Sequence, residues 1–318
     1  MTLADTTRSN PARSDTTRPG TRGARRRGHG AGGTTAGAPR RRRRPWSARR
    51  VLTLAALVVM TLLWIYPFIW LVSASLKQSS EIFSSGLNLM PETFRWENYL
   101  RAWTEAGFAQ YFLNTVIITV GAIVIVVVRS ALAGYVLGRY AFPGKRILIG
   151  IFLVTFFLPE GYTIIPVTQL TDQLGLLNTH AGVILGLSAG GHIASTLLYA
   201  GFFRGLPKEL EESAKLDGAG AFRTFFQVML PLSWPITATV TILTFLAAWN
   251  AYLLPLVFTL STPELQTLAI GMTSFVSDYG QDWSGMAAGA VISLVPVVIV
   301  FVILQRKFVD SIAGAVKQ

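Results

Sequence analysis

Between two apolar segments the chain carries the polar stretch GLPKELEESAKLDGAGAFRTFFQVMLP, residues 205–231. Its first half predicts a short helix, because Pro207 suits a first helical turn and the acidic residues that follow complement the positive end of the helix dipole. Gly218 and Gly220 predict the end of that helix and a sharp turn. We expect a second short helix over about 221–229, stopped by Pro231. Side chains at i, i+3, i+4 and i+7 should give it one apolar face: Phe222, Phe225, Phe226 and Met229.

The segments around this stretch predict an all-α integral membrane protein. Of the 318 residues, 51% are hydrophobic and 14% are charged, whereas a soluble domain is about 25% charged. A spanning helix needs about 20 apolar residues. We expect six transmembrane helices, near residues 51–73, 112–136, 147–166, 181–203, 233–256 and 285–305. The polar segment 204–232 is long for a connection between spans, which makes it a candidate functional loop. By composition alone, an elbow lying on the membrane surface fits equally well.

The net charge of +12 belongs to the N-terminal tail, residues 1–50. This tail holds fourteen of the 28 basic and two of the 16 acidic residues, so the body, residues 51–318, contains fourteen of each. With few large apolar side chains, the tail is expected to be disordered. Its arginine runs, Arg25–Arg27 and Arg40–Arg44, have a composition that suits RNA or anionic lipid. We favour a simpler role, in which the tail holds the first helix's start in the cytoplasm, and we expect no nucleic-acid partner.

Loop charges predict the orientation. With the tail inside, 24 of the 28 basic residues fall on the cytoplasmic side, Arg129 lies within the second span, and Lys77, Arg95 and Arg101 lie outside. Both termini are therefore expected in the cytoplasm. The uncharged run from Val51 to Leu76 far exceeds the roughly 7–15 residues of a signal-peptide core, which favours a permanent helix. The small residues Ser73 to Ser75 keep cleavage as the alternative.

The loop contains a recognisable pattern. Glu212-x-Ala214-x-x-Asp217-Gly218-Ala219, followed by Leu230-Pro231, resembles the EAA loop of ATP-binding-cassette (ABC) importer permeases, with Ser213 in place of the middle alanine. Further stretches, in order along almost the whole body, resemble the carbohydrate branch and its maltose-permease second subunit: Asn98-Tyr99 with Tyr111–Thr115, Phe142–Arg146, Leu174–Thr179, Trp249–Leu256 and Gln305–Lys317. The fourth departs from the pattern at Ala251, where an acid is common. The resemblance implies the type I ABC importer permease fold.

The resemblance also implies a mechanism and partners. In this family the EAA segment is a coupling helix in a cleft of a cytoplasmic ATPase, which assigns the contact here to Glu212, Ala214, Asp217, Gly218, Leu230 and Pro231. The implied partners are a second, different permease, two ATPase subunits and an extracellular solute-binding protein, in a bacterial inner membrane. The implied substrate is a sugar or oligosaccharide, with glycerol phosphate or another polyol as the alternative.

The residues agree that this chain handles no ATP. A phosphate-binding loop needs Gly-x-x-x-x-Gly-Lys followed by Ser or Thr. The nearest stretch, Gly138 to Gly144-Lys145, has five intervening residues and continues with Arg146. ATP and Mg²⁺ are therefore expected on the partner subunits, and the chain is predicted to be a transport subunit with no cofactor of its own. From another class, a stand-alone channel or secondary carrier remains the alternative.

Polar residues within the spans are candidates for the substrate path. Glu160 lies in a stretch loosened by proline and glycine, and a position near the outer interface is its alternative. Trp249, Asn250 and Tyr252 combine an amide with aromatic rings, a set that suits a sugar, although Asn250 equally suits an interhelical hydrogen bond. His180 and His192 have no companions at ligand spacing, and cysteine is absent, so we expect no metal site.

Overall fold

The computed structural model describes residues 48–84, 86, 88–155, 157, 160–189, 193–277 and 280–316. The chain divides into two compact units, Met1–Ala55 and Ala56–Gln318. Residues 1–47 lie outside the described part, and with them the expected disorder of the tail. Within the described residues the regular secondary structure is helical apart from one small antiparallel hairpin, β1 (Val276–Ser277) and β2 (Gly280–Gln281).

Long apolar helices dominate the described part of the chain. Among the described residues, three helices are long and apolar enough to cross a membrane: α1 (Ala48–Ser75), α4 (Phe108–Arg139) and the first part of α15 (Trp283–Val316). Two bent pairs raise the number to as many as five: α7 (His180–Ala189) with α8 (Ile193–Gly205), and Ala221–Leu232 with α12 (Trp234–Trp249). The bends are 59° and 76°. These helices correspond to five of the six predicted spans.

The remaining predicted span, 147–166, is not one continuous helix. It is divided into α5 (Lys145–Thr155), a 3-10 turn η1 (Glu160–Thr163) and α6 (Ile164–Gln173). The interruption coincides with Pro159 and Gly161 in the sequence. Proline lacks the N–H that a helix interior needs, and glycine has a low helix propensity, so the apolar run is interrupted where these residues meet.

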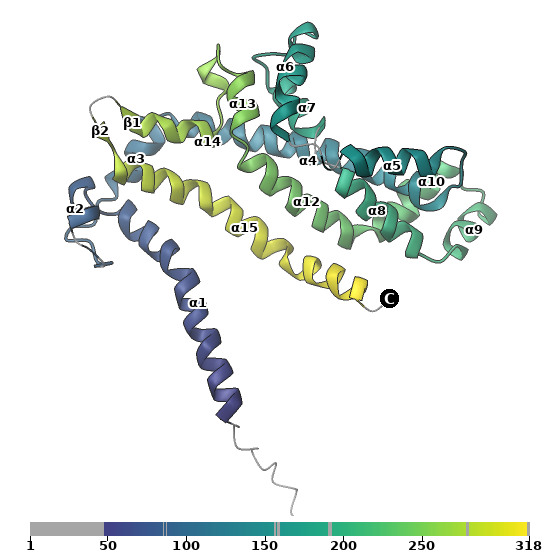
Figure 1. The fold of residues 1–318 in the computed structure, drawn as a ribbon, viewed down its shortest axis with the longest axis horizontal. Helices are drawn as coiled ribbons and strands as arrows, with labels where there is room; N and C mark the ends of the chain where they lie inside the picture. The colour runs from purple at the N-terminus through teal and green to yellow at the C-terminus, as the bar shows by residue number, and fades with distance from the viewer. Residues whose placement is uncertain are drawn as a thin grey trace, which may run out of the picture. The chain divides into compact units, whose positions relative to one another are not determined.

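Short elements connect and cap the long helices. They are α2 (Ser79–Ser84), α3 (Glu97–Thr104), α9 (Glu209–Leu216), α10 (Ala221–Thr224), η2 (Phe225–Met229), α11 (Leu230–Leu232), α13 (Leu253–Phe258), η3 (Pro263–Leu265), α14 (Leu268–Gly271) and η4 (Met272–Phe275). In Figure 1, α2, α3 and the hairpin lie at one end of α4 and α15, and α9 and α10 lie at the other. We call these the cap end and the loop end.

Helix α4 is the centre of the packing, with α7, α8 and α12 against it. The core at the loop end joins α4, α8 and η2 through Tyr135, Tyr199, Phe203, Phe225 and Met229. Gly134 allows the close approach of α4 to α8, because a Cβ at this position would overlap the Cβ of Tyr199 and lie 2.9 Å from the carbonyl oxygen of Thr196. The absence of a side chain there therefore sets the separation of the two helices.

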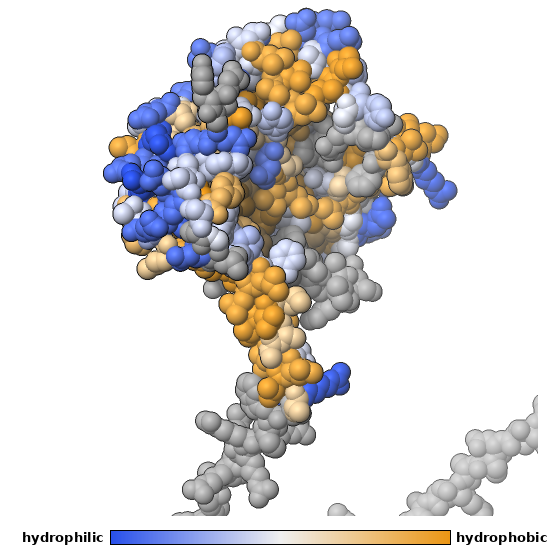
Figure 2. Space-filling view, turned by 60° about the vertical axis from the view of Figure 1, so that its left-hand side comes forward, coloured by the Kyte–Doolittle hydropathy of each residue, from blue (hydrophilic) through white to orange (hydrophobic). Residues whose placement is uncertain are grey.

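Apolar side chains also cover much of the outside. Along α1, residues such as Leu62 and Trp64 are exposed, and Figure 2 shows hydrophobic residues continuing along this helix while hydrophilic residues gather over the cap end. Exposed apolar surface of this extent is unusual for a soluble monomer. It is the surface that a protein presents to the hydrocarbon of a bilayer.

Candidate functional site

The EAA loop begins with the predicted short helix, α9 (Glu209–Leu216). The chain turns sharply after it, and Gly218 has a φ of +78°, in the left-handed region that favours glycine. The N–H of Ala219 donates to the carbonyl of Ala214 at 2.9 Å and closes the helix end. The prediction that Gly218 makes the turn is confirmed.

The second helix differs from expectation, because it continues past Pro231 to Leu232. Residues 225–229 form a π-helical turn, in which the N–H of Leu230 donates to the carbonyl of Phe225, five residues earlier. The 76° bend falls just after Leu232, where the buried hydroxyl of Ser233 donates to the Leu230 carbonyl at 2.7 Å. The prediction that Pro231 stops the helix is therefore wrong.

The π turn also divides the expected apolar face. Phe225 and Met229 are buried in the core, whereas Phe222 and Phe226 are exposed. A π turn advances each residue through a smaller angle than an α turn. Positions that an α-helical pattern places on one side are therefore spread over two.

The EAA residues point in different directions. Glu212, Asp217 and Gly218 are exposed, Leu230 packs on the core and Pro231 is exposed. Ala214 is only 8% exposed and lies on the inward side of α9, which packs against η2. A small residue here lets α9 lie close to its own chain, and the expected partner contact at Ala214 stays a prediction.

Leu216 is a surface residue that the sequence interpretation missed. It is 89% exposed at the end of α9, between charged neighbours. The sequence feature that could have indicated this exposure is the spacing: Leu216 follows Ala214 by two positions and therefore lies on the opposite side of the helix. Together with Glu212 and Asp217 it gives α9 an outward face with one apolar contact point, which we call the docking face.

Arg139, the last residue of α4, binds the start of the EAA loop. Its Nε donates to Oε1 of Glu211 at 2.9 Å, and its two terminal nitrogens donate to the carbonyls of Leu206 and Pro207 at 2.8 Å each. The Arg139 and Glu211 side chains are 6% and 16% exposed. From the sequence, Arg139 is only one of the basic residues that predict the membrane orientation, and Glu211 only an acid that complements the start of a helix. They are 72 positions apart, so no periodicity or motif links them.

A second region of interest is a cavity of about 740 Å³ bounded by α6, α7, α8, α12 and α13. Asn250 and Tyr252 line it, as do Thr163, Ser195 and Thr244. The amide of Asn250 donates to the carbonyl of Leu246 at 2.8 Å, which leaves its own oxygen as an acceptor. The buried hydroxyl of Thr244 has no hydrogen-bond partner among the described residues. The cavity therefore offers uncharged polar groups on a mainly apolar wall.

Trp249 and Glu160 stand apart from this set. Trp249 is 5% exposed, its indole N–H donates to the carbonyl of Ser293 at 3.1 Å, and its ring stacks on Phe245 with centroids 5.2 Å apart. It packs α12 on α15 and lines a separate cavity of about 330 Å³, so the expected place of Trp249 in the substrate path stays a prediction. Consecutive residues of a helix point about 100° apart, which separates Trp249 from Asn250. The side chain of Glu160 lies outside the described part of the chain.

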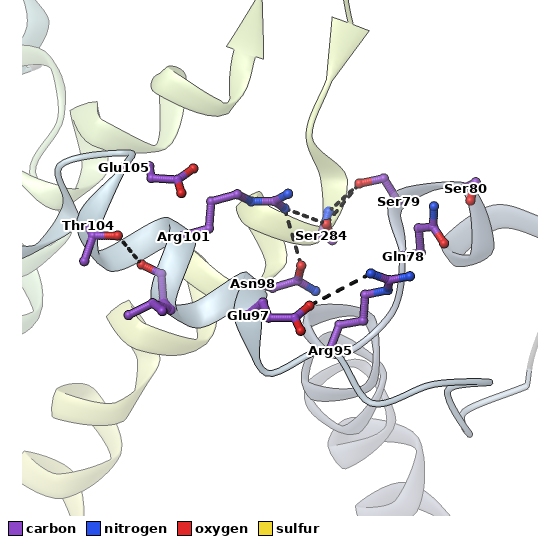
Figure 3. A pocket seen from close by; sticks show the side chains of 11 residues that line it. Gln78, Ser79, Ser80, Arg95, Glu97, Asn98, Arg101, Thr104, Glu105 and Ser284 are labelled. Carbon is purple, nitrogen blue, oxygen red and sulfur yellow. Dashed lines mark hydrogen bonds and ion pairs between the residues drawn. The ribbon is translucent and has the colours of Figure 1, made fainter.

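At the cap end, a polar pocket of about 490 Å³ lies among α2, α3 and the start of α15 (Figure 3). Arg101 bonds Asp282 at 2.8 Å and also reaches Ser284. Burial opposes the charge on Asp282, but the N–H of Gly285, the hydroxyl of Ser284 and the guanidinium of Arg101 outweigh it and hold the pKa of this carboxyl below its usual value. The ion pair fastens the start of α15 to α3.

His180 has a structural contact. Its Nε2 lies 3.0 Å from Oδ1 of the buried Asn114, whose amide donates to the carbonyls of Glu264 and Gln266. Since that amide provides both donors, Oδ1 is the acceptor and Nε2 of His180 carries the hydrogen. The described residues contain no group of three metal-binding side chains, and His192 lies outside them.

Comparison with known proteins assigns the family. Residues 130–314 match the family model described as the inner membrane component of binding-protein-dependent transport systems. The chain belongs to this family of ABC importer permeases. It is 38% identical to the diacetylchitobiose uptake system permease protein NgcG of Streptomyces coelicolor over 83% of its own length and 86% of that protein. It is 31% identical to the arabinooligosaccharides transport system permease protein AraQ of Bacillus subtilis, over 86% and 97%.

A solved structure shares the fold of this permease. A chain of a bacterial ABC transporter involved in the import of the acidic polysaccharide alginate matches with a TM-score of 0.71, covering 81% of this chain and 95% of that one at 23% identity. The expected type I importer fold is confirmed, and the chain is a multi-pass membrane protein.

Proposed function

We propose that this permease forms part of the membrane path for a sugar or oligosaccharide, driven by ATP hydrolysis on partner subunits. The observation that carries the proposal is the 740 Å³ cavity, where Asn250, Tyr252 and Thr244 place amide and hydroxyl groups on an apolar wall. Sugars present hydroxyls and apolar C–H faces, so such a wall complements them. Relatives named for diacetylchitobiose and arabinooligosaccharide transport support the same substrate class.

Glycerol phosphate is the competing substrate, because the sn-glycerol-3-phosphate transport system permease protein UgpE of Yersinia pestis is 32% identical over 82% of this chain and 95% of that protein. A phosphate group is held by arginine, lysine or clustered N–H donors. Among the described residues that line the cavity there is no lysine or arginine. This neutral wall favours an uncharged carbohydrate.

The coupling role belongs to the EAA loop. In the proposed arrangement the docking face, Glu212, Leu216 and Asp217, sits in a cleft of one of two ATPase subunits, which hold the ATP and Mg²⁺. Gly218 shapes the turn behind this face, and Leu230 and Pro231 lead into the bent span. The ATP-bound assembly then favours the outward-open arrangement, because nucleotide binding differs between the two states.

The loop end and both termini are proposed to be cytoplasmic. Outside the tail, ten basic residues fall on that side against three on the other. The cap end then faces an extracellular solute-binding protein, and a second, different permease completes the path. Both permeases lie in the bacterial inner membrane.

Reconstitution tests the proposal. Proteoliposomes holding this chain, the second permease, both ATPase subunits and the binding protein should accumulate labelled diacetylchitobiose or an arabinooligosaccharide only when ATP is supplied on the ATPase side. Vesicles with this chain alone should accumulate neither. Uptake by the lone chain would establish a channel or secondary carrier, and ATP-driven uptake of glycerol 3-phosphate in place of the sugars would overturn the substrate class.

A further inference from the structure

Arg139 joins two parts of the permease that the EAA motif does not connect. We propose that it is a positioning residue that makes α4 and the coupling helix α9 move as one body. This inference rests on the proposed contact between α9 and an ATPase, and it adds the route by which movement of α9 reaches the spans.

The contacts of Arg139 with Glu211, Leu206 and Pro207 link α4 to the start of α9, and we call this link the tie. The guanidinium bonds the Glu211 carboxylate in the first turn of α9 and the carbonyls of Leu206 and Pro207, which lie between α8 and α9. One planar group therefore holds the junction and the helix that follows it. The fork of donors in arginine suits such a multiple contact, which lysine cannot reproduce. With both side chains nearly buried, loss of either leaves the other charge uncompensated.

The neighbouring packing completes a closed unit. Close packing at Gly134 holds α4 against α8, and α8 runs directly into the junction that Arg139 binds. One turn before Arg139, the Tyr135 ring contacts Phe203 of α8 and Phe225 of η2, with centroids 5.5 and 5.2 Å away. Helix α4 is thus joined to α8 by packing and to α9 by the ion pair, and the junction that Arg139 binds connects α8 to α9. A displacement of α9 cannot be absorbed at the junction while Arg139 holds it.

The tie and the docking face use different sides of α9. Glu211 points inward to Arg139, whereas Glu212 and Leu216 are exposed. Removing the Arg139 side chain therefore leaves the docking face chemically unchanged. The expected defect is uncoupling: the ATPase still binds, but its closure no longer moves α4.

The first test is Arg139→Ala in the complete importer. We expect normal copurification of the ATPase subunits and basal ATP hydrolysis within about twofold of wild type, since the docking face is intact. Stimulation of hydrolysis by sugar-loaded binding protein, and sugar uptake, should each fall at least about tenfold. Arg139→Lys should give an intermediate value because one ammonium keeps the ion pair but not the planar fork. Arg146→Ala removes an exposed cation of α5 and should match wild type.

A covalent replacement separates positioning from folding. The chain has no cysteine, so Arg139→Cys with Glu211→Cys, in a complex whose other subunits are also cysteine-free, carries the only thiols. The double variant should be uncoupled, and a short bifunctional thiol reagent should restore stimulated hydrolysis and uptake. Single-cysteine variants treated with the reagent should show no recovery.

Three outcomes would overturn the inference. These are wild-type stimulation and uptake in Arg139→Ala, a defect that bridging does not repair, and loss of ATPase copurification in an Arg139→Ala chain that inserts normally. If the alanine chain fails to insert, Glu211→Ala decides, because it removes both the charge and the oxygen acceptor that Arg139 binds; full coupling in that variant would contradict the tie. Failure of the proposed function is distinguishable, because wild-type importer would then fail to copurify with ATPase or to use ATP for uptake.

Discussion

At the residue scale, Leu216 is an apolar side chain that is 89% exposed in this chain. Leu216→Asn should therefore change the free energy of unfolding by no more than about 0.5 kcal/mol. If the leucine anchors the docking face, the binding free energy of the Leu216→Asn permease for the ATPase should weaken by about 2 kcal/mol, which lowers the affinity roughly thirtyfold. The amount of ATPase that copurifies with the variant, compared with wild type, measures this loss of affinity. Leu260→Asn, at another exposed leucine, should leave ATPase copurification unchanged. If both variants retain as much ATPase as wild type, Leu216 is not part of the contact.

Gly218 is constrained by backbone geometry. At a φ of +78°, a side chain costs about 1–2 kcal/mol, and a β-branched one fits poorly. Gly218→Val should shift the end of α9, so we expect sugar uptake to be lost while membrane insertion stays normal. Gly220 has a φ of −71° and should accept alanine with little effect. If Gly218→Val transports normally, the turn is a passive elbow and plays no part in coupling.

At the scale of elements, hydropathy located the helices whose apolar runs are unbroken, α1, α4 and α15. For the spans that are bent or divided, hydropathy located the apolar region but not the position of the bend or break. The bend after Leu232 follows a π turn in which Phe225 and Met229 are buried in the core, and no pattern along the chain marks that turn. Motifs found the EAA loop, because its residues are contiguous. The Arg139–Glu211 pair escaped, since only the fold brings the two residues together.

The α4–α8 contact is an element-scale feature that one residue tests. Gly134→Leu places a large side chain against the Tyr199 Cβ and the Thr196 carbonyl, so the helices must separate. We expect the free energy of unfolding to fall by about 1–3 kcal/mol. The fall should appear as a lower midpoint in thermal unfolding of the detergent-solubilised importer. Gly150→Ala, where an added Cβ meets nothing within 4 Å, is the matched control. An unchanged midpoint for Gly134→Leu would mean that α4 and α8 separate at little cost.

At the scale of the whole molecule, charge and structure divide the chain in nearly the same place. The basic tail of residues 1–50 carries the entire net charge of +12, while the neutral body contains the spans, the cavity and the EAA loop. Every contact that we propose for coupling, from the docking face through Arg139 to α4, lies within that body. The tail is therefore expected to influence orientation and to leave the transport cycle itself unchanged.

Deletion of residues 1–45 tests this separation. The truncated chain keeps Arg49, Arg50 and ten further basic residues on the proposed cytoplasmic side, twelve against three on the other, a bias that favours the same topology. We expect uptake close to wild type in the reconstituted importer. Because the native chain lacks cysteine, single cysteines placed at Leu216 and at Ser80, at opposite ends of the molecule, report orientation through labelling with a membrane-impermeant thiol reagent. Only the Ser80 position should label from outside intact cells. Complete loss of uptake in a truncation that labels in this way would show that the tail acts in transport itself.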